Sequence, residues 1–336
     1  MPRRHAAQHP TRRTLLASFA GLAALGATRP ASAQSAAGWP QRPVRLLVPF
    51  AAGGNIDVMG RLMAQRLSET LGQQFIVENR VGGGGIVATE AVARSAPDGY
   101  TLLWASTNVI AIVPATGKVP YDPVKDFAPV SALGTSPQVL LAHGKLPVKS
   151  VAELVSWVKA QPGKVAYGGG GGPGSASNLI MQLFLKRAGL EMTSVSYRGT
   201  APALTDLIAG HIPTTFVPVS EAHAQANNPN VRMLAVSSAT RARRVPDVPA
   251  IAETYPGFHA VSWTGMLAPA ATPREMVEKL ASVMVDAGKD PKFVDQLTTH
   301  GIDLLTEGPA KFAAMIASEI PVWAEAVRIA GVKVEQ

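Results

Sequence analysis

The chain has 336 residues, no cysteine, and 31 basic against 23 acidic side chains. Without cysteine it can form no disulfide and perform no thiolate chemistry, and its length allows a large core divided between two lobes. Residues 1–33 contain five of the arginines and no acid, so the remaining 26 basic and 23 acidic side chains give a net charge of only +3. This modest charge excludes a strongly basic surface, and no nucleic-acid partner is expected.

Residues 1–33 have the organisation of a secretion signal. Arginine pairs at positions 3–4 and 12–13 precede an apolar run at 15–27, and residues 31–33 form the Ala-Ser-Ala pattern that a signal peptidase cuts. The apolar run is too short to span the ~30 Å hydrocarbon core of a bilayer. The second arginine pair resembles a twin-arginine signal, so the Sec and twin-arginine export routes both stay open. The sequence predicts a periplasmic protein whose signal peptide is cleaved after Ala33.

Downstream of the signal, strand-length apolar runs alternate with amphipathic helical segments that begin at capping residues such as Asn55 and Ser150. The predicted strands are 44–49, 75–78, 101–104, 165–167, 193–197 and 231–236. The predicted helices are 55–71, 86–94, 151–160, 177–188, 200–209, a helix after the capping box Thr272–Glu275, and one or two helices over 309–330, the second starting at Pro321. This alternation predicts a mostly parallel α/β sheet.

Glycine-rich turns follow a strand and precede a helix in both halves of the mature chain. Gly53 and Gly54 form the first turn, and residues 168–174 form the second. The carboxyl ends of parallel strands border the ligand crevice in such folds. Glycine lets backbone N–H groups approach an anion closely, and a helix N-terminus adds about half a positive charge. We therefore predict that the two turns face each other across a cleft and bind a small anion.

The sequence contains no assembled catalytic or metal-binding motif. It has no P-loop, GxSxG elbow or HExxH motif, and the histidines after the signal are isolated. Residues 169–174 match a GxGxxG pattern, but no acid follows the next strand as a dinucleotide site requires. No cofactor, no metal and no enzymatic activity are therefore expected. An exported α/β enzyme that uses the same cleft stays open as an alternative.

A set of short segments, in order along the mature chain, resembles one family of receptors. The matching segments are 39–45, 48–57, 77–80, 96–103, 120–123, 126–130, 197–207, 245–249 and 267–269. On these segments the chain resembles the substrate-binding receptors of tripartite tricarboxylate transporters, the Bug family. The resemblance covers essentially the whole mature part.

The resemblance implies a type II periplasmic-binding-protein fold, with two α/β lobes joined by a two-stranded hinge and a ligand cleft between them. Residues 39–137 plus 262–336 would form the first lobe, and residues 138–261 the second. The implied function is capture of a small carboxylate-containing ligand for the membrane subunits of a tripartite transporter, and a monomer is expected. A ligand-sensing receptor that docks on a signalling partner stays open as an alternative.

The resemblance also implies which residues bind the ligand, mostly through backbone groups and water. In the first lobe they are Phe50, Ala51, Ala52, Gly53, Gly54, Asn55 and Asp57 of the strand–helix turn, together with Ser106, Thr107 and Asn108. In the second lobe they are Gly169, Gly170, Gly171, Gly172, Gly174, Ser175, Ser177 and Asn178, together with Arg198, Gly199 and Thr200.

Three positions in the second lobe depart from the family pattern. Asn178 stands where the family usually has histidine, and Pro213 and Val217 stand where it usually has acids. A pocket wall with fewer acids is poorly suited to an ammonium group. We therefore hypothesise that the ligand carries a carboxylate but no ammonium.

Overall fold

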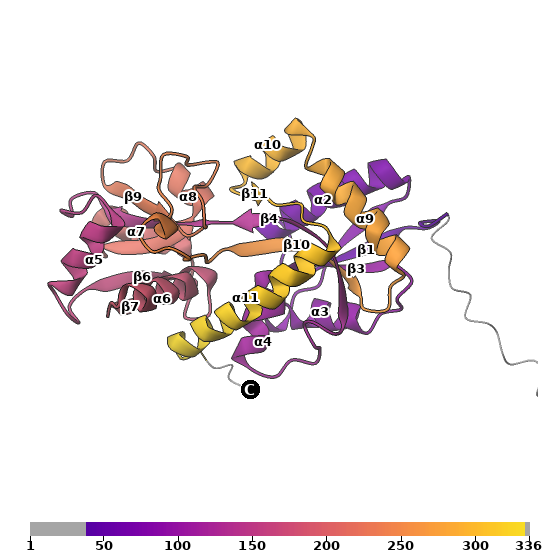
Figure 1. Ribbon diagram of the computed structural model, residues 1–336, viewed down its shortest axis with the longest axis horizontal. Helices are drawn as coiled ribbons and strands as arrows, with labels where there is room; N and C mark the ends of the chain where they lie inside the picture. Colours follow the sequence, from indigo (N-terminus) through magenta and orange to yellow (C-terminus); the bar gives the residue numbers. More distant parts are fainter. Residues whose placement is uncertain (1–37, 333–336) are drawn as a thin grey trace, which may run out of the picture. The chain divides into compact units, whose positions relative to one another are not determined.

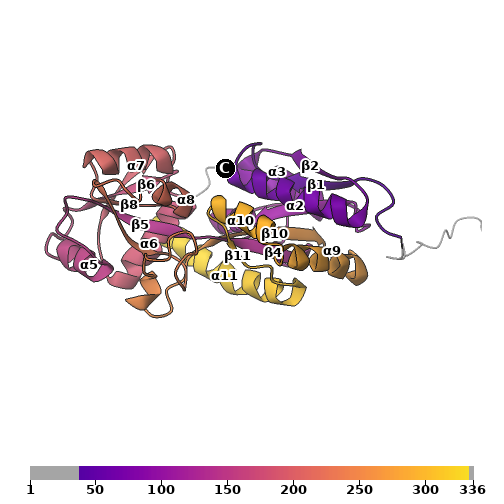
Figure 2. The same ribbon diagram turned by 90° about the horizontal axis from the view of Figure 1, so that it is seen from above.

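The computed structural model describes residues 38–332, so the predicted signal peptide and its cleavage site after Ala33 lie outside the described residues (Figure 1). Residues 39–332 build two mixed β-sheets with helices packed around them (Figures 1 and 2). The strand order is β11-β4-β10-β3-β1-β2 in the first sheet and β7-β6-β8-β5-β9 in the second. The expected α/β fold with two lobes is confirmed.

The first sheet combines a parallel part with an antiparallel part. Strand β1 pairs in parallel with β2 and β3, and β10 pairs antiparallel with β3 and β4. Its strands are β1 (Val44–Val48), β2 (Phe75–Asn79), β3 (Thr101–Ser106), β4 (Phe127–Ser136), β10 (Ser262–Pro269) and β11 (Asp303–Leu304). The associated helices are α2 (Asn55–Leu71), η1 (Gly83–Gly85), α3 (Ile86–Ala93), η2 (Asn108–Ile112), α4 (Val113–Thr116), α9 (Arg274–Ala287), α10 (Pro291–Thr299) and α11 (Pro309–Ala330). Central strands such as β3 are almost wholly buried, as their apolar runs predict.

The chain leaves the first sheet after β4, forms the whole second sheet, and then returns to the first sheet at β10. Its strands are β5 (Gln138–His143), β6 (Ala166–Gly170), β7 (Thr193–Tyr197), β8 (Thr214–Pro218) and β9 (Val231–Val236). Its helices are α5 (Val151–Lys159), α6 (Ala176–Ala188), α7 (Thr200–Ala209), α8 (Val219–His223) and η3 (Ile251–Glu253). The predicted cap of α5 is present, because the Ser150 side chain accepts a hydrogen bond from the backbone N–H of Glu153.

Helix α11 contacts elements of both lobes. It packs against η2 and β4 on the side of the first sheet and against α6 on the side of the second. Its residues Phe312 and Ile316 belong to an apolar core around β3 and β10, which we term the first core. Trp323 and Val327 belong to the apolar core around α6, which we term the second core. One helix therefore links the cores of the two lobes (Figure 2).

Two predicted boundaries were wrong. Strand β6 continues through Gly170 instead of ending at Tyr167, because Gly169 and Gly170 pair with Ser196 and Tyr197 of β7. Helix α9 begins after Pro273, so the predicted Thr272 cap does not form, and the Thr272 hydroxyl has no hydrogen-bond partner.

Over 309–330, where one or two helices were expected, a single helix forms. It runs unbroken through Pro321, since the packing of Phe312 and Trp323 compensates for the single backbone hydrogen bond that proline removes. Five strands were not predicted individually: β4, β5, β8, β10 and β11. They owe their conformation to long-range pairing with each other and their neighbours.

Candidate ligand-binding site

A pocket of about 230 Å³ lies where the two lobes approach each other. Neutral side chains line it: Phe50, Asn55, Ile56, Met59, Ser106, Asn108, Ile112, Ser136, Ala176, Ser262, Trp263, Thr264 and Ile302. Among these only Ala176 belongs to the second lobe as the sheets define it. Without a cation or an acid in the lining, an anionic ligand would depend on N–H and hydroxyl donors.

The N-terminus of α2 is the first source of such donors. Asn55 and Ile56, its first two residues, line the pocket. The preceding residue, Gly54, has extended backbone and no side chain that could cap the helix. The first N–H groups of a helix have no partner within the helix, and the macrodipole makes this end positive. The start of α2 can therefore bind an anion.

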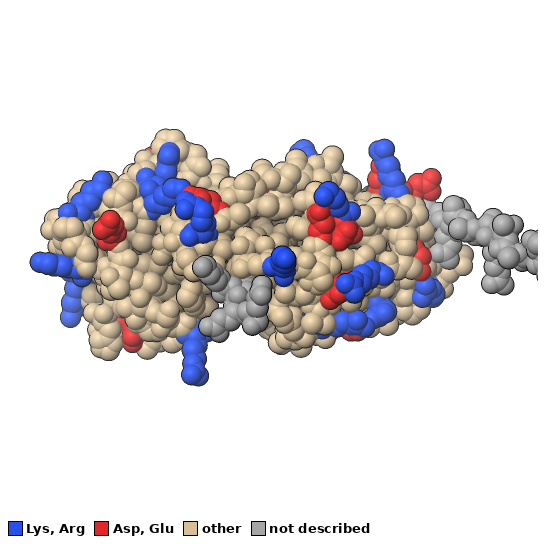
Figure 3. All heavy atoms as spheres, turned by 90° about the horizontal axis from the view of Figure 1, so that it is seen from below, with Lys and Arg blue, Asp and Glu red and all other residues tan. Residues whose placement is uncertain are grey.

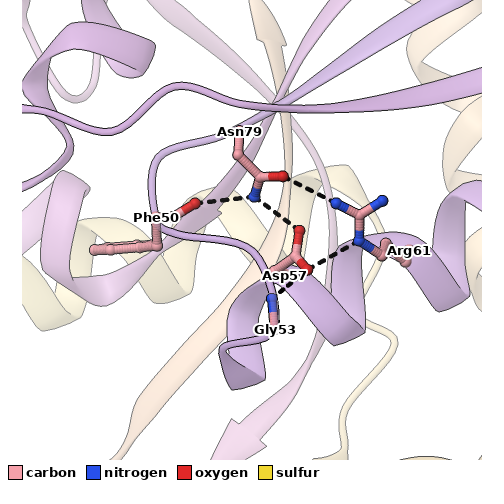
Figure 4. Close-up of polar contacts among 5 residues, drawn as sticks. All are labelled: Phe50, Gly53, Asp57, Arg61 and Asn79. Atoms are coloured by element: carbon pink, nitrogen blue, oxygen red, sulfur yellow. Dashed lines mark hydrogen bonds and ion pairs between the residues drawn. The ribbon is translucent and has the colours of Figure 1, made fainter.

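The Asp57 carboxylate holds the turn before α2 in place (Figure 4). One of its oxygens accepts hydrogen bonds from the Gly53 N–H and from Arg61 Nε, both at 2.9 Å. The other accepts from Asn79 Nδ2 at 2.7 Å, and the same amide donates to the Phe50 carbonyl at 2.9 Å. Asp57 is only 1% exposed and does not line the pocket. It supports the loop that the sequence resemblance assigned to the ligand.

The pKa of Asp57 follows from the same contacts. Burial alone would raise it, but the hydrogen bonds from Arg61, Gly53 and Asn79, with the charge of Arg61, outweigh burial and place the pKa below its ordinary value. The carboxylate is therefore ionised at neutral pH. Its charge is neutralised inside the network and is not available to a ligand.

Ser106 is the second source of donors. It ends β3, is only 3% exposed, and its Oγ is buried without a hydrogen-bond partner while the residue lines the pocket. A buried hydroxyl without a partner is costly and marks a position where a ligand can complete the bonding. The two residues after it are already engaged: Thr107 Oγ1 accepts from the Trp263 N–H at 2.8 Å, and Asn108 Nδ2 donates to the Gly84 carbonyl at 3.0 Å.

The second-lobe glycine turn brings the N-terminus of α6 to the pocket. Gly171 and Gly172 adopt positive φ values of 90° and 81°, which glycine tolerates best. The chain then turns into α6 at Ser175, whose side chain caps the helix by accepting from the Asn178 N–H. Ala176, the first helical residue, is the one that lines the pocket.

Asn178 and Ser177 serve the structure of the turn. The Asn178 amide donates to the Pro173 carbonyl at 2.8 Å and accepts from the Tyr167 hydroxyl at 2.9 Å. Ser177 donates to Gln138 Oε1 at 2.7 Å. Both side chains are buried and do not line the pocket. The Asn178 side chain therefore completes an internal network.

The Arg198–Thr200 turn lies outside the pocket lining. Arg198 is exposed, and the Thr200 hydroxyl donates to Glu221 Oε1 at 2.6 Å. Thr200 also lies directly against Gly170, since a Cβ added to Gly170 would come within 2.9 Å of the Thr200 Cα. The turn therefore packs against the glycine segment.

Of the residues assigned to the ligand from sequence, the pocket brings together Phe50, Asn55, Ser106 and Asn108. The others, which do not line it, are Ala51, Ala52, Gly53, Gly54, Asp57, Thr107, Gly169, Gly170, Gly171, Gly172, Gly174, Ser175, Ser177, Asn178, Arg198, Gly199 and Thr200. The residues that sequence reasoning missed are Ile56, Met59, Ile112, Ser136, Ala176, Ser262, Trp263, Thr264 and Ile302. Helical spacing from Asn55 could have indicated Ile56 and Met59, but the wall formed by β4 and β10 depends on long-range pairing.

Charges on the described surface are dispersed. Lys and Arg side chains lie scattered over the face drawn in Figure 3, with Asp and Glu beside several of them. Among residues 38–332 no group of three or more His, Asp or Glu side chains is arranged to hold a metal ion. In the same part of the chain, no helix combines the length and apolar character needed to cross a bilayer.

Comparison with known proteins identifies the family. Residues 59–331 match the model of the tripartite tricarboxylate transporter family receptor. The chain is 34% identical to the protein BugT of Bordetella pertussis over 320 residues, which cover 94% of this chain and 96% of BugT. The chain therefore belongs to the tripartite tricarboxylate transporter receptor family, as the sequence resemblance predicted.

Solved structures of related receptors share the fold. A ligand-free TctC solute-binding protein from Polaromonas matches with a TM-score of 0.79 at 26% identity, covering 86% of this chain and 99% of that one. An R. palustris protein solved with adipate matches with a TM-score of 0.71 at 34% identity, covering 88% and 99%. MatC from Rhodopseudomonas palustris, with bound malate, matches with a TM-score of 0.68 at 32% identity, covering 86% and 100%.

Proposed function

We propose that this receptor captures a small carboxylate without an ammonium group, of the kind represented by adipate and malate. The ligand lies in the pocket beside the N-terminus of α2, and the observation that carries the proposal is the buried Ser106 hydroxyl, which lacks a partner there. One ligand carboxylate accepts hydrogen bonds from this hydroxyl and from the free N–H groups of Asn55 and Ile56. The start of α6 at Ala176 meets the other end of the ligand.

The chemistry of the pocket wall supports this ligand class. Two related receptors were solved with adipate and with malate, which are carboxylates without an ammonium group. The lining of this pocket contains no acid that could pair with an ammonium, and apolar side chains such as Phe50, Ile56 and Met59 suit the carbon chain of the ligand. Each hydrogen bond to a charged carboxylate contributes roughly 1.5–3 kcal/mol. Three of these bonds contribute about 5–9 kcal/mol, and burial of the ligand's carbon chain against the apolar side chains adds to them, so that about 8 kcal/mol, or micromolar affinity, is reached after the cost of ordering the ligand.

We propose further that the pocket closes when one lobe moves toward the other. The boundaries between the two lobes lie at residues 137–138 and 261–262. The chain passes between the sheets at these two points. One observation supports an open state in this structure: Ala176 is the one pocket-lining residue that belongs to the second lobe. Closure brings the rest of the predicted second-lobe residues toward the ligand.

The cellular role follows from the family and from the signal-like N-terminus. In this proposal the signal is removed after Ala33, the mature chain works in the periplasm, and it delivers its ligand to the membrane subunits of a tripartite transporter. It performs no catalysis, because the pocket lining offers no pair of general base and nucleophile. Incubation with each candidate acid, followed by product analysis, should therefore return the acid unchanged.

Isothermal titration calorimetry with a panel of acids tests the ligand class. Adipate, malate, citrate and benzoate represent carboxylates without an ammonium group, and aspartate and glutamate represent amino acids. We expect micromolar or tighter binding of at least one member of the first set and much weaker binding of the amino acids. Tight binding of an amino acid alone would refute the proposal.

A further inference from the structure

Glu319 is a buried carboxyl group without a cationic partner. It is 9% exposed and lies on α11. The other carboxylate that is comparably buried in residues 38–332 is Asp57, which forms an ion pair with Arg61 at 2.9 Å. Within the same residues Glu319 takes part in no ion pair and instead accepts a hydrogen bond from Trp323 Nε1 at 3.3 Å. A buried acid held only by neutral groups is expensive to maintain.

A second indole connects Glu319 to the ligand pocket. Trp263 is 2% exposed, lines the pocket, and its ring packs edge-on against Phe312 of α11 with centroids 5.1 Å apart. Its Nε1 is buried and makes no hydrogen bond in this structure. An indole is a donor only, so this N–H needs an acceptor.

Glu319 lies on α11 at the junction of the two lobes. Phe312 and Ile316 before it belong to the first core, and Trp323 after it belongs to the second. Ile320, the next residue, packs against both. A polar contact at this point can therefore respond to the relative position of the lobes.

We propose that Glu319 is a positioning residue for ligand binding, whose carboxylate orients the Trp263 wall of the pocket by accepting the N–H groups of Trp263 and Trp323 at the junction between the lobes. Trp263 Nε1 is a buried donor without an acceptor, and Glu319 is a buried acceptor without a cation. A hydrogen bond between them would satisfy both groups. The part of this inference that concerns affinity rests on the ligand class proposed above.

The protonation of Glu319 gives the arrangement a measurable signature. Burial raises the pKa of this carboxyl to about 7, although two indole N–H groups lower it in part: that of Trp323, which donates to it, and that of Trp263, which lies close without completing a hydrogen bond. In the proposed arrangement the ionised carboxylate accepts from both indoles, whereas the protonated acid must also donate its own hydrogen. The Trp263 contact should therefore be stronger above pH 7 than below it.

Charged groups on the elements packed against α11 have other partners. On α11 and α6, Glu325 pairs with Arg328 and with Lys186, and Arg187 donates to the Pro256 carbonyl. Lys311, near the start of α11, pairs with Glu307.

The remaining elements contribute few charges. Strands β4 and β10 and the segments η2 and α4 carry no charged residue. Helix α9 has fewer contacts with α11, and most of its charged side chains have partners of their own. Arg274 pairs with Glu278, and Lys289, just after the helix, pairs with Asp286. Lys279 donates to the Trp39 carbonyl, and Glu275 is the remaining charged residue of this helix. His259 belongs to the loop beside α6, and burial lowers its pKa.

Tryptophan fluorescence of the ligand-free protein, titrated between pH 5.5 and 8.5, tests the proposal directly. We expect a transition near pH 7 in the wild type that disappears in Glu319→Gln, which keeps the size of the side chain but cannot ionise. Trp263→Phe should reduce the amplitude of this transition and leave only the part reported by Trp323, which donates to Glu319. A transition of full amplitude in Trp263→Phe would overturn the proposed contact between Glu319 and Trp263. Glu278→Gln, an exposed acid on α9, should leave the transition unchanged. The histidines remain in every variant, so the difference isolates Glu319.

Affinity for adipate and malate provides the second measurement. Wild-type affinity should increase roughly threefold to tenfold from pH 6 to pH 8, since a tenfold change equals a shift of about one pKa unit in the bound state. In Glu319→Gln this dependence should be lost. Superimposable fluorescence titrations of wild type and Glu319→Gln would overturn the proposal. If neither acid binds the wild type at any pH, the proposed ligand class fails, and the fluorescence titration still decides the role of Glu319.

Discussion

Two buried polar residues near the pocket illustrate how neighbours decide a side chain's role. Asp57 is surrounded by donors and a cation, so its charge is consumed in holding the 50–54 turn. Ser106 is equally buried but has no partner, so its hydroxyl stays available. We infer that Asp57 shapes the site and Ser106 contacts the ligand.

Replacing Ser106 with alanine should weaken ligand binding without harming the fold. The hydroxyl makes no hydrogen bond within the protein, so its loss removes only a bond to the ligand carboxylate, worth roughly tenfold or more in affinity. Calorimetry with the tightest-binding acid measures the change, and Thr205→Ala, which removes an exposed hydroxyl on α7, serves as the control. Equal affinities of Ser106→Ala and wild type would show that Ser106 does not contact the ligand.

Replacing Asp57 with asparagine should destabilise the protein in a pH-dependent manner. The amide puts a donor where three donors already converge, and we expect a loss of about 1–3 kcal/mol in the free energy of unfolding at pH 7. Because the folded pKa of Asp57 lies below its ordinary value of 3.8, its contribution is present above that pH and fades as pH falls below it. The cost of the substitution should therefore shrink in acid.

Urea denaturation at pH 7 and near pH 3 compares the two conditions. Asp295→Asn, an exposed acid on α10, should have little effect at either pH. A cost of Asp57→Asn that is the same at both pH values would contradict the assignment of an ionised, hydrogen-bonded Asp57.

At the scale of elements, the site is built from two similar units, each a strand followed by a tight turn and a helix. In the first unit β1 leads through the 50–54 turn to α2, and in the second β6 leads through the 171–174 turn to α6. Both helices present their first residues to the pocket. The geometry requires close packing behind the second turn, where Gly170 lies against Thr200.

Substituting alanine for Gly170 should disturb the second unit specifically. The added Cβ would come within 2.9 Å of the Thr200 Cα, a backbone atom that cannot move alone. We expect a loss of roughly 1–3 kcal/mol in stability, typical of overpacking, together with weaker ligand binding. Gly308→Ala is the matched control, because a Cβ added there would meet no heavy atom within 4 Å and the φ of −65° at this position suits alanine. Thermal denaturation that ranks the two variants equally would argue against this close approach.

Sequence patterns predicted the local parts of this architecture and missed the long-range parts. The capping residue Ser150 and the glycine at position 72 define α5 and α2 because caps act within a few residues. Gly169 and Gly170 were assigned to a loop, because the pairing with β7 that makes them a strand is distant in sequence. The position of Trp263 and Ser262 in the pocket lining was not predicted for the same reason, since the pairing of β10 with β4 places them there.

At the scale of the whole mature chain, three connections join the lobes: the passage from β4 to β5, the return from the second sheet to β10, and helix α11. The first two form the proposed hinge. The third carries Glu319 and Trp323, and its Phe312 ring packs against the pocket residue Trp263. Closure on a ligand must therefore be accommodated by α11 as well as by the two strands.

A crystal structure of the receptor bound to its tightest-binding acid tests the central claim most directly. We predict one carboxylate within hydrogen-bonding distance, about 2.7–3.2 Å, of Ser106 Oγ and of the backbone N–H of Asn55 or Ile56. The start of α6 should lie against the other end of the ligand. A ligand bound elsewhere, for example in the groove beside Lys186 and His259, with the α2 N-terminus unoccupied, would contradict the account.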